Sequence, residues 1–481
     1  MGNNTSVISN FIWRFLERCG AQGVTFVVSI VLARLLDPTV YGTIALVTIF
    51  TTIMQVFVDS GLGNALIQKK EADDLDFSSV FWFNMSMCTA LYIIMFFFAP
   101  LIALFYKMPE LTPVVRVLSL ILIISGVKNV QQAYVSRNML FKKFFFSTLG
   151  GTIGAAGVGI VMAYLGLGVW ALVAQMLFNA AVDTAILWFT VKWRPKKQFS
   201  LERLKGLFSY GWKLLVSALI DTVYNDLRQL IIGKIYSPSD LAQYNQGKKF
   251  PQLIVTNINT SIDSVLLPTM SKAQESTESV KNMTRRSIKT STYIMMPFMV
   301  GFAVCAEPLV SIILTKKWLP CVFFLRIFCF TFAFYPIHTA NLNAIKALGR
   351  SDLFLKLEII KKIVGITAIV STMFISVKAM ALSMLITSIL SQIINSWPNK
   401  KLMNYSYLEQ LKDMIPQIGL SLFMGAIVYC IQFLGMNDIV ILIVQIFAGG
   451  FLYLAGSKVF HIDSFEYLTS IVKGLLKKKN A

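Results

Sequence analysis

Histidine and reactive sequence motifs are scarce in this chain of 481 residues. Its only histidines are His338 and His461, so a histidine-based metal or hydrolytic site is not expected. The six cysteines form no Cys-x-x-Cys pair and lie in or beside apolar segments, where cysteine usually serves as a small packing residue. No Gly-x-x-x-x-Gly-Lys-Ser/Thr loop is present, which argues against ATP hydrolysis by the chain. These absences favour a protein that is not an enzyme and has no metal site.

Charge is also scarce, because charged residues make up 14% of the sequence and hydrophobic residues 56%. A soluble domain of this length would carry far more charge, so the composition predicts an integral membrane protein. The net charge of +20 would suggest a nucleic-acid partner in a soluble protein. Here the basic residues fall mostly between apolar segments, where membrane topology explains them. We therefore expect the lipid bilayer, and no nucleic acid, as a partner.

Apolar segments long enough to cross a bilayer recur along the whole chain, since a spanning helix needs about 20 residues. The expected spans, about 14 in number, are 11–36, 42–62, 78–106, 113–135, 147–166, 168–190, 208–235, 240–268, 287–314, 321–345, 354–376, 378–397, 412–434 and 438–457. Very short connections near 165–168 and 377–378 predict tight helical hairpins. Lysine and arginine concentrate in alternate loops, which places both termini in the cytoplasm. The predicted fold is all-α.

Two expected helices near the middle of the chain, 210–235 and 240–268, are polar along one face. On the first helix, polar residues recur every three or four positions at Lys213, Ser217, Asp221, Tyr224 and Arg228. On the second, they recur at Asn245, Lys249, Gln252, Thr256, Asn259 and Asp263. Lipid cannot solvate such groups, so they are expected to face a bundle interior or a water-filled cavity. We interpret the two faces as walls of a transport pathway.

The beginning of the chain is similar to this stretch, which indicates an internal repeat. Asp37-Pro38-Thr39 corresponds to Ser237-Pro238-Ser239, and Asp59 corresponds to Asp263. The first two expected helices also carry polar faces, made by Arg14, Arg18, Gln22, Thr25 and Ser29 and by Thr48, Gln55 and Asp59. Repeats of this kind are common in secondary transporters, where the substrate binds between the repeats.

Three local sequences carry a family resemblance. They are Phe11-Ile12-Trp13-Arg14, then Leu32-Ala33-Arg34-Leu35-Leu36-Asp37-Pro38 followed by Tyr41-Gly42, and finally Asp59-Ser60-Gly61-Leu62-Gly63-Asn64-Ala65-Leu66-Ile67-Gln68. Together with the expected spans, they make the chain similar to the polysaccharide flippases of the multidrug/oligosaccharidyl-lipid/polysaccharide exporter superfamily. It most resembles the Wzx-type exporters of O-antigen, colanic acid and teichuronic acid.

The resemblance implies two six-helix lobes related by pseudo-two-fold symmetry, followed by two extra helices. The corresponding segments are an N-terminal lobe at 1–192, a basic cytoplasmic linker at 193–204, a C-terminal lobe at 205–398, an additional helix pair at 399–457 and a basic cytoplasmic tail at 458–481. It also implies that the chain moves an undecaprenyl-diphosphate-linked oligosaccharide from the inner to the outer leaflet of the bacterial cytoplasmic (inner) membrane, for lipopolysaccharide or exopolysaccharide export. A polysaccharide polymerase and a chain-length regulator would be further partners.

Such a cargo would need cations to replace the water around its diphosphate, and amides to bind its sugars. The candidates for a cationic lumen are Arg14, Arg18, Lys128, Lys213, Arg228, Lys249 and Arg326. The candidates for a polar cavity are Gln22, Gln55, Asn225, Asn245, Gln252 and Asn259. Coupling to H⁺ or Na⁺ would need a carboxylate, for which the candidates are Asp59, Asp221 and Asp263. No other cofactor is expected.

Each candidate also has a purely structural interpretation. Arg14, Arg18 and Lys213 could anchor helix ends by reaching the lipid headgroups. Asp221 and Arg228 share one helix face and could form a structural charge network. The ion-coupling carboxylates could likewise form salt bridges that only stabilise the fold.

Two other functions compete with lipid-linked oligosaccharide transport. A multidrug or organic cation antiporter of the same superfamily would need an acidic lumen, whereas the polar faces are at least as basic as acidic. A membrane enzyme such as a polymerase or ligase usually presents a large external loop. The external loops expected here are short, which leaves no room for such a catalytic platform.

Overall fold

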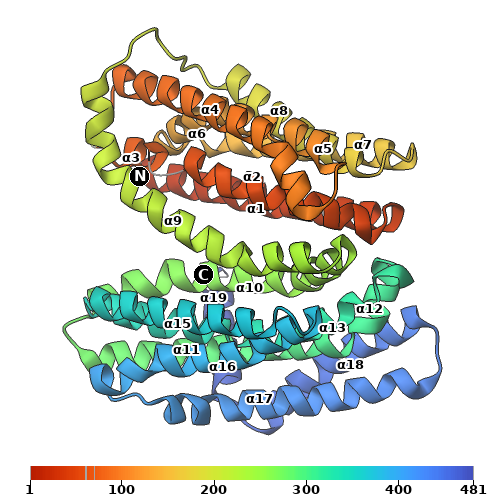
Figure 1. Ribbon diagram of the computed structural model, residues 1–481. Helices are drawn as coiled ribbons and strands as arrows, with labels where there is room; N and C mark the ends of the chain where they lie inside the picture. The colour runs from red at the N-terminus through yellow and green to blue at the C-terminus, as the bar shows by residue number, and fades with distance from the viewer. Residues whose placement is uncertain (1, 60–61, 70, 480–481) are drawn as a thin grey trace. The chain divides into compact units, whose positions relative to one another are not determined.

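The computed structural model describes residues 2–59, 62–69 and 71–479, and Figure 1 shows that this part of the chain is built from helices and their connections. No strand occurs in these ranges, which confirms the predicted all-α fold. Contacts divide the chain into two compact units, Met1–Ala242 (unit 1) and Gln243–Ala481 (unit 2). The narrower lobes expected at 1–192 and 205–398, and the linker and tail between and after them, stay predictions.

Unit 1 contains, in chain order, α1 (Gly2–Leu35), α2 (Pro38–Asp59), α3 (Leu62–Gln68), α4 (Asp74–Tyr106), α5 (Leu111–Leu118), α6 (Leu120–Arg137), α7 (Phe141–Tyr164), α8 (Val169–Thr190) and α9 (Leu201–Ile235). The most extensive packing joins α7 to α8, and α1 lies against α7. The expected hairpin between α7 and α8 is confirmed. Its turn uses Gly166 (φ 74°) and Gly168 (φ 53°), a left-handed backbone conformation that glycine adopts at little cost.

Small residues on α7 allow this close packing. Gly151, Ala155 and Gly159 recur every four positions and are buried. A Cβ atom on Gly151 would lie 2.8 Å from the side-chain oxygen of Asn179, and one on Gly159 would lie 3.1 Å from the Cβ of Gln175. Helices in membranes associate through such small-residue faces, because lipid offers no hydrophobic force to hold them together.

A capping box fixes the start of α4. The backbone N–H of Asp76 donates to the Asp73 carboxylate at 2.9 Å, and the backbone N–H of Asp73 donates to the Asp76 carboxylate at 3.2 Å. The first of these hydrogen bonds lowers the pKa of Asp73. Lys69 adds an ion pair of 2.6 Å to Asp76, whose side chain is fully buried. The connection between α3 and α4 is therefore held by charge as well as by backbone geometry.

Unit 2 contains most of α10 (Pro238–Lys272), then α11 (Thr277–Val304), α12 (Ala306–Ile313), α13 (Cys321–Ala333), α14 (Tyr335–Ala347), α15 (Ser351–Thr372), α16 (Val377–Met403), α17 (Tyr407–Cys430), α18 (Asp438–Val459) and α19 (Asp463–Lys479), with 3-10 turns at Lys316–Trp318 and Ile431–Leu434. Helix α11 packs against α17, α13 and α14.

Buried amides join α14, α16 and α17 in this unit. Asn341 and Gln410 exchange two side-chain hydrogen bonds of 2.9 and 3.0 Å, and Asn399 donates to Asn341 at 2.6 Å. All three side chains are buried. Because a buried amide left without a partner is costly, this network fixes how α17 packs on the rest of the unit.

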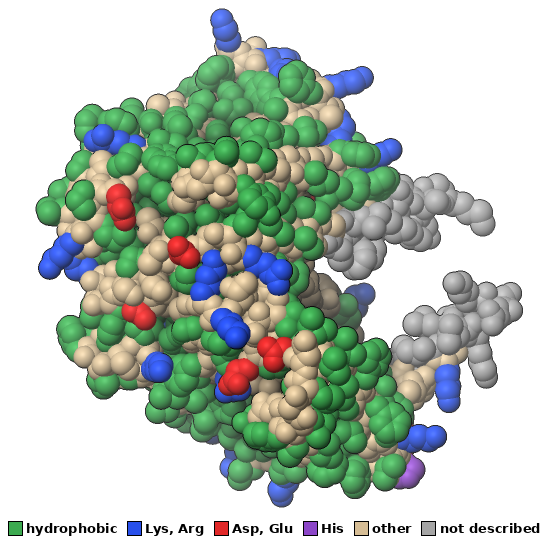
Figure 2. Space-filling model, turned by 90° about the vertical axis from the view of Figure 1, so that its right-hand side faces the viewer, with side chains coloured by type: hydrophobic (Ala, Val, Ile, Leu, Met, Phe, Trp, Pro, Cys, Tyr) green, Lys and Arg blue, Asp and Glu red, His purple; other side chains and the backbone are tan. Residues whose placement is uncertain are grey.

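Many helices are apolar enough to cross a bilayer. Within the described ranges there are 9 such spans, or 10 if the bent pair α11 and α12 is one span. Large apolar side chains are exposed on them, for example Phe97 on α4 and Phe447 on α18, and hydrophobic side chains dominate the face drawn in Figure 2. The chain is therefore a multi-pass membrane protein. The other expected spans match α1, α9, α10 and α15, which carry more polar side chains, so the total of about 14 and the cytoplasmic termini stay predictions.

One expected helix is wrong in detail. The segment 287–314 is broken at Cys305, where α11 and α12 meet at an angle of 68°. Pro308 has no N–H to donate to the carbonyl of Val304, which interrupts the helical hydrogen bonds at this point. The segment 458–481, expected as a tail, contains the helix α19.

A substitution at Gly247 tests how closely α10 packs against α13. A Cβ atom there would lie 2.8 Å from the carbonyl oxygen of Cys321 and 2.8 Å from the backbone nitrogen of Leu325. Because backbone atoms cannot swing aside, we expect Gly247→Ala to lower the free energy of unfolding by about 1–3 kcal/mol. Thermal unfolding of the detergent-solubilised protein would measure the loss.

Gly419→Ala on α17 is the matched control, since no atom lies within 4 Å of a Cβ placed there. This change should leave stability equal or raise it by up to about 1 kcal/mol, because alanine is the better helix former. Equal stability of the two variants would contradict the close approach of α10 to α13.

Candidate functional site

A polar chamber of about 300 Å³ lies in unit 1 and is open to its surface. Its walls come from α1, α2, α3, α6 and α7, and the polar side chains that line it include Glu17, Asp59, Asn129, Gln132 and Thr148. Two carboxylates and two amides therefore face one small space within an apolar bundle. Such groups can hold a proton or a small cation, because carboxylate and amide oxygens replace the water that the ion loses.

An asparagine donates a hydrogen bond to a carboxylate of the second helix in each half of the predicted repeat. In unit 1, the Asn129 amide donates to Asp59 at 3.4 Å and to the carbonyl of Val58 at 3.2 Å. In unit 2, the Asn343 amide donates to Asp263 at 2.9 Å. The sequence predicted that Asp59 and Asp263 are equivalent, and the structure gives them the same type of partner. Gln55 is a second donor to Asp59, at 3.3 Å.

Lys128 forms an ion pair with Asp183 inside unit 1. The two charged atoms are 3.0 Å apart, and 21% and 14% of the respective side chains are exposed. The pair joins α6 to α8. The Asp183 carboxylate compensates the charge of Lys128 within the fold. A contact between Lys128 and a cargo stays a prediction.

Two arginines donate hydrogen bonds to helix carbonyls, one in each unit. Pro100 in α4 has no N–H for the carbonyl of Phe96, and Arg116 donates to that carbonyl at 3.2 Å. At the break between α11 and α12, Arg326 donates to the carbonyl of Ala303 at 3.1 Å. Arg326 also forms an ion pair of 3.2 Å with Glu307. These contacts hold the Arg326 guanidinium at the bend of its own unit.

The predicted polar faces of α9 and α10 are unevenly exposed. Arg228 is 8% exposed, whereas Lys213, Asp221 and Asn225 on the same helix are exposed. On α10, Lys249 and Asn245 are half-buried and Gln252 is exposed. The buried side-chain oxygen of Asn259 has no hydrogen-bond partner in the described part of the chain.

Lys249 is the least compensated of these groups. The structure records no ion pair or hydrogen bond between its ammonium group and another described residue. Gln22, at the other end of the chain, has an exposed side chain. The side chains of Arg14 and Arg18 lie outside the described residues, so their predicted roles remain predictions.

The sequence patterns missed Asn129, Asn343, Glu17 and Arg116. Asn129 and Asn343 lie 70 and 80 positions from their carboxylate partners. No helical periodicity connects residues so far apart. A comparison of the two halves of the repeat beyond their first two helices could have pointed to Asn129 and Asn343.

Residues 31–323 match the model of a family described as "Polysaccharide biosynthesis protein". The chain is 25% identical over 317 residues to the succinoglycan biosynthesis transport protein ExoT of Rhizobium meliloti, a match that covers 66% of this chain and 64% of that protein. It is 22% identical over 372 residues to the lipopolysaccharide biosynthesis protein WzxC of Escherichia coli, over 77% of this chain and 76% of that one. The first match thus spans less than two thirds of its relative.

Solved structures show the same fold. The lipid II flippase MurJ in an inward closed conformation matches with a TM-score of 0.73 at 17% identity, covering 96% of this chain and 99% of that one. An inward-facing multidrug resistance transporter of the MATE family, within the MOP superfamily, matches with a TM-score of 0.63 at 15% identity, over 80% of this chain and 95% of that one. The chain belongs to this family of polysaccharide biosynthesis proteins.

A charge-removal series at Lys128 and Asp183 would separate structure from transport. Lys128→Met leaves Asp183 without its partner in an apolar bundle, so we expect a loss of about 3 kcal/mol in unfolding free energy, near the low end for breaking a buried ion pair. The double variant Lys128→Met with Asp183→Leu should recover most of that loss, which unfolding of the purified protein would measure.

Export by the double variant then reports on the role of Lys128. A stable double variant without export would indicate that the cation meets cargo, and one with normal export would assign the pair to the fold. If the double variant were as unstable as Lys128→Met, the ion pair would not be the source of the stability.

Proposed function

We propose that this chain is a flippase for lipid-linked oligosaccharides, which moves undecaprenyl-diphosphate-linked repeat units from the inner to the outer leaflet of a bacterial cytoplasmic membrane by alternating access. Membership of the polysaccharide biosynthesis family and the MurJ-like fold support a transporter of this class. The names of the relatives support a polysaccharide precursor as cargo.

The observation that carries the proposal is the half-buried Lys249, which lacks a carboxylate partner in the described ranges. A cation taken out of water without a partner is costly, so its presence on a polar helix face favours an anionic ligand that compensates it. The diphosphate of the proposed cargo would do so. In unit 1, the buried Arg228 is a second candidate for phosphate, because its planar group offers two-point hydrogen bonding, which lysine cannot supply.

The polar but uncharged groups on the same face suit the sugars. Asn245 is half-buried, four positions before Lys249 on the same helix. The buried side-chain oxygen of Asn259 lacks a donor among the described residues. Sugar hydroxyl groups would supply such donors. An organic cation, the cargo of a multidrug antiporter, would instead be repelled by Lys249.

As part of the same proposal, Asp59 and Asp263 are the carboxylates that bind the coupling ion. Each carboxylate accepts a hydrogen bond from an asparagine of a neighbouring helix, and Asp59 also faces the polar chamber. Binding of H⁺ or Na⁺ would neutralise the carboxylate and release its amide partner. That exchange would link ion occupancy to the packing of α2 on α6 and of α10 on α14.

The first prediction concerns the two cations. Lys249→Ala and Arg228→Ala should each reduce export at least tenfold, while Arg228→Lys should keep part of it because the charge remains but the planar fork is lost. The measurement uses cells that lack the native gene and quantifies carrier-linked glycan in right-side-out vesicles with a membrane-impermeant glycan probe.

Lys272→Ala is the matched control, because Lys272 is an exposed cation in the last turn of the same helix α10. It should export normally. Membrane levels and thermal unfolding of every variant must match wild type for the comparison to count. Normal export by both Lys249→Ala and Arg228→Ala would reject the cationic site, and normal outer-leaflet glycan without the chain would reject the flippase.

The second prediction concerns coupling. In proteoliposomes with an imposed gradient of H⁺ or Na⁺, wild-type transport should accelerate, and Asp59→Asn or Asp263→Asn should keep basal transport but lose the acceleration. An amide has the shape of the carboxylate and cannot take up a proton or compensate a cation. Acceleration that survives in both single variants and in the double variant would remove these residues from ion coupling.

A further inference from the structure

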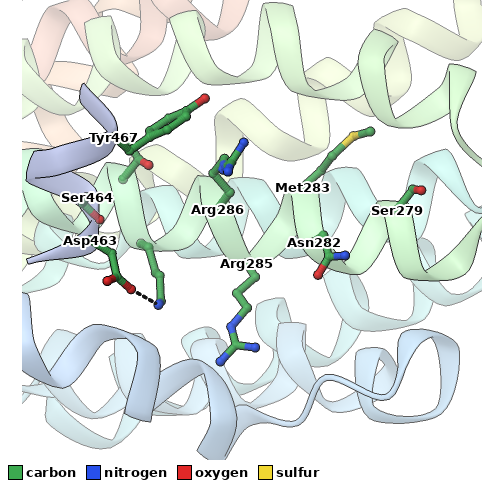
Figure 3. A pocket seen from close by; sticks show the side chains of 10 residues that line it. Ser279, Asn282, Met283, Arg285, Arg286, Asp463, Ser464 and Tyr467 are labelled. Atoms are coloured by element: carbon green, nitrogen blue, oxygen red, sulfur yellow. Dashed lines mark hydrogen bonds and ion pairs between the residues drawn. The ribbon is translucent and has the colours of Figure 1, made fainter. Parts of the chain in front are cut away.

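A cavity of about 680 Å³ opens between α11 and α19 in unit 2, away from the residues assigned to cargo. Figure 3 shows its lining, with Arg285, Arg286 and Lys289 from α11 and Asp463, Ser464 and Tyr467 from α19. Three cations from one helix thus meet the amphipathic C-terminal helix. Basic pockets of this kind, between the ends of helices at the cytoplasmic surface, suit lipid headgroups.

Two of the three cations are compensated within the fold. Arg285 forms an ion pair of 2.7 Å with Asp413, and Lys289 forms one of 2.9 Å with Asp463. Asp413 is further held by a hydrogen bond of 2.8 Å from the hydroxyl of Tyr405. These contacts connect α11 to α17 and α19. Asp463, which lines the cavity, and Asp413 are therefore both already paired with cations of α11.

Arg286 is the third cation of the cavity, and neither of these two ion pairs includes it. Its guanidinium lies 4.3 Å from the centre of the Tyr467 ring, and it has no carboxylate partner in the described part of the chain. Figure 3 shows it on the opposite side of α11 from Arg285. Stacking on the tyrosine orients the planar donor group without neutralising it. The cavity therefore offers one positive charge without a carboxylate partner, and its lining also includes the hydroxyl groups of Ser279, Thr290 and Ser464.

A separate apolar groove lies further along the same face of α11. Ser279, Met283, Arg286 and Thr290 recur every three or four positions in the cavity, and Ile294, Pro297 and Gly301 continue the series in a groove of about 560 Å³. Met424 of α17 and Tyr453 of α18 line its other sides. Arg286 and Pro297 are about 16 Å apart along the helix axis at a rise of 1.5 Å per residue. That is close to the depth of one leaflet, about half of a hydrocarbon core of roughly 30 Å.

We infer that α11, α18 and α19 form a binding site for an anionic phospholipid, with its phosphate at Arg286 and an acyl chain in the groove that runs past Pro297 and Gly301. The net charge identifies the occupant, because a single uncompensated arginine matches the single charge of a phosphodiester such as phosphatidylglycerol. A diphosphate carrier would bring more negative charge than the cavity leaves unmatched. The lipid would hold α19 against the rest of unit 2, because it would contact both Arg286 of α11 and α19.

The test titrates the purified full-length protein, in a mild neutral detergent, with phosphatidylglycerol or phosphatidylcholine and follows its thermal unfolding. Phosphatidylglycerol should raise the unfolding temperature of the wild-type protein more than phosphatidylcholine does. Arg286→Gln should weaken the phosphatidylglycerol effect about tenfold in lipid concentration, because one charge-assisted hydrogen-bonding group is lost. Lys401→Gln, which removes an exposed cation of α16 outside the cavity, should leave it unchanged.

The groove is tested separately with Gly301→Leu, since no atom lies within 4 Å of a Cβ at Gly301 and the new side chain would occupy open groove. This variant should unfold as wild type does without lipid, yet need more long-chain phosphatidylglycerol for the same shift. Three results would overturn the inference: an unchanged response in Arg286→Gln, the full shift with sn-glycerol 3-phosphate alone, or displacement of phosphatidylglycerol by equimolar undecaprenyl diphosphate. The second would indicate a free-anion site and the third a cargo site.

Discussion

Compensation of charge inside an apolar molecule is the constraint on which the other features depend. Lys128 pairs with Asp183, Arg326 with Glu307 and Arg285 with Asp413. Each pair joins two helices. Lys128–Asp183 is the least exposed of the three, and there charges that lipid would not tolerate become a contact that fixes helix packing. Lys249 and Arg286 have no carboxylate partner in the described part of the chain, and they are where an external anion would compensate a charge.

Much of this arrangement could be predicted from the sequence because it is local. The sequence placed breaks at 37–39 and 237–239, and the structure begins α2 at Pro38 and α10 at Pro238, since proline at the first turn loses no helical hydrogen bond. The glycine turn at 165–168 also indicated its hairpin. The bend at Cys305 escaped prediction, because Pro308 lies in a run that remains apolar on both sides and hydropathy does not register a missing N–H.

The partners of the candidate site could not be predicted in the same way. Asp59 and Asp263 were expected from the polar faces and from the repeat, whereas Asn129 and Asn343 come from helices much further along the chain. Side-chain spacing describes one helix at a time. It says which face is polar, and it does not say which other helix that face meets. The fold was thus more predictable than the contacts that give the site its chemistry.

The pairing of a proline with a distant arginine has a consequence for synthesis. The carbonyl of Phe96 loses its helical donor at Pro100 and receives a replacement only from Arg116, 20 positions after Phe96. At about 5–20 residues per second, a ribosome adds those residues in about one to four seconds. During that interval α4 has an unsatisfied carbonyl that lipid cannot solvate. Helix α4 is thus complete as a membrane helix only once the following segment has emerged, which makes the two segments a single unit of insertion.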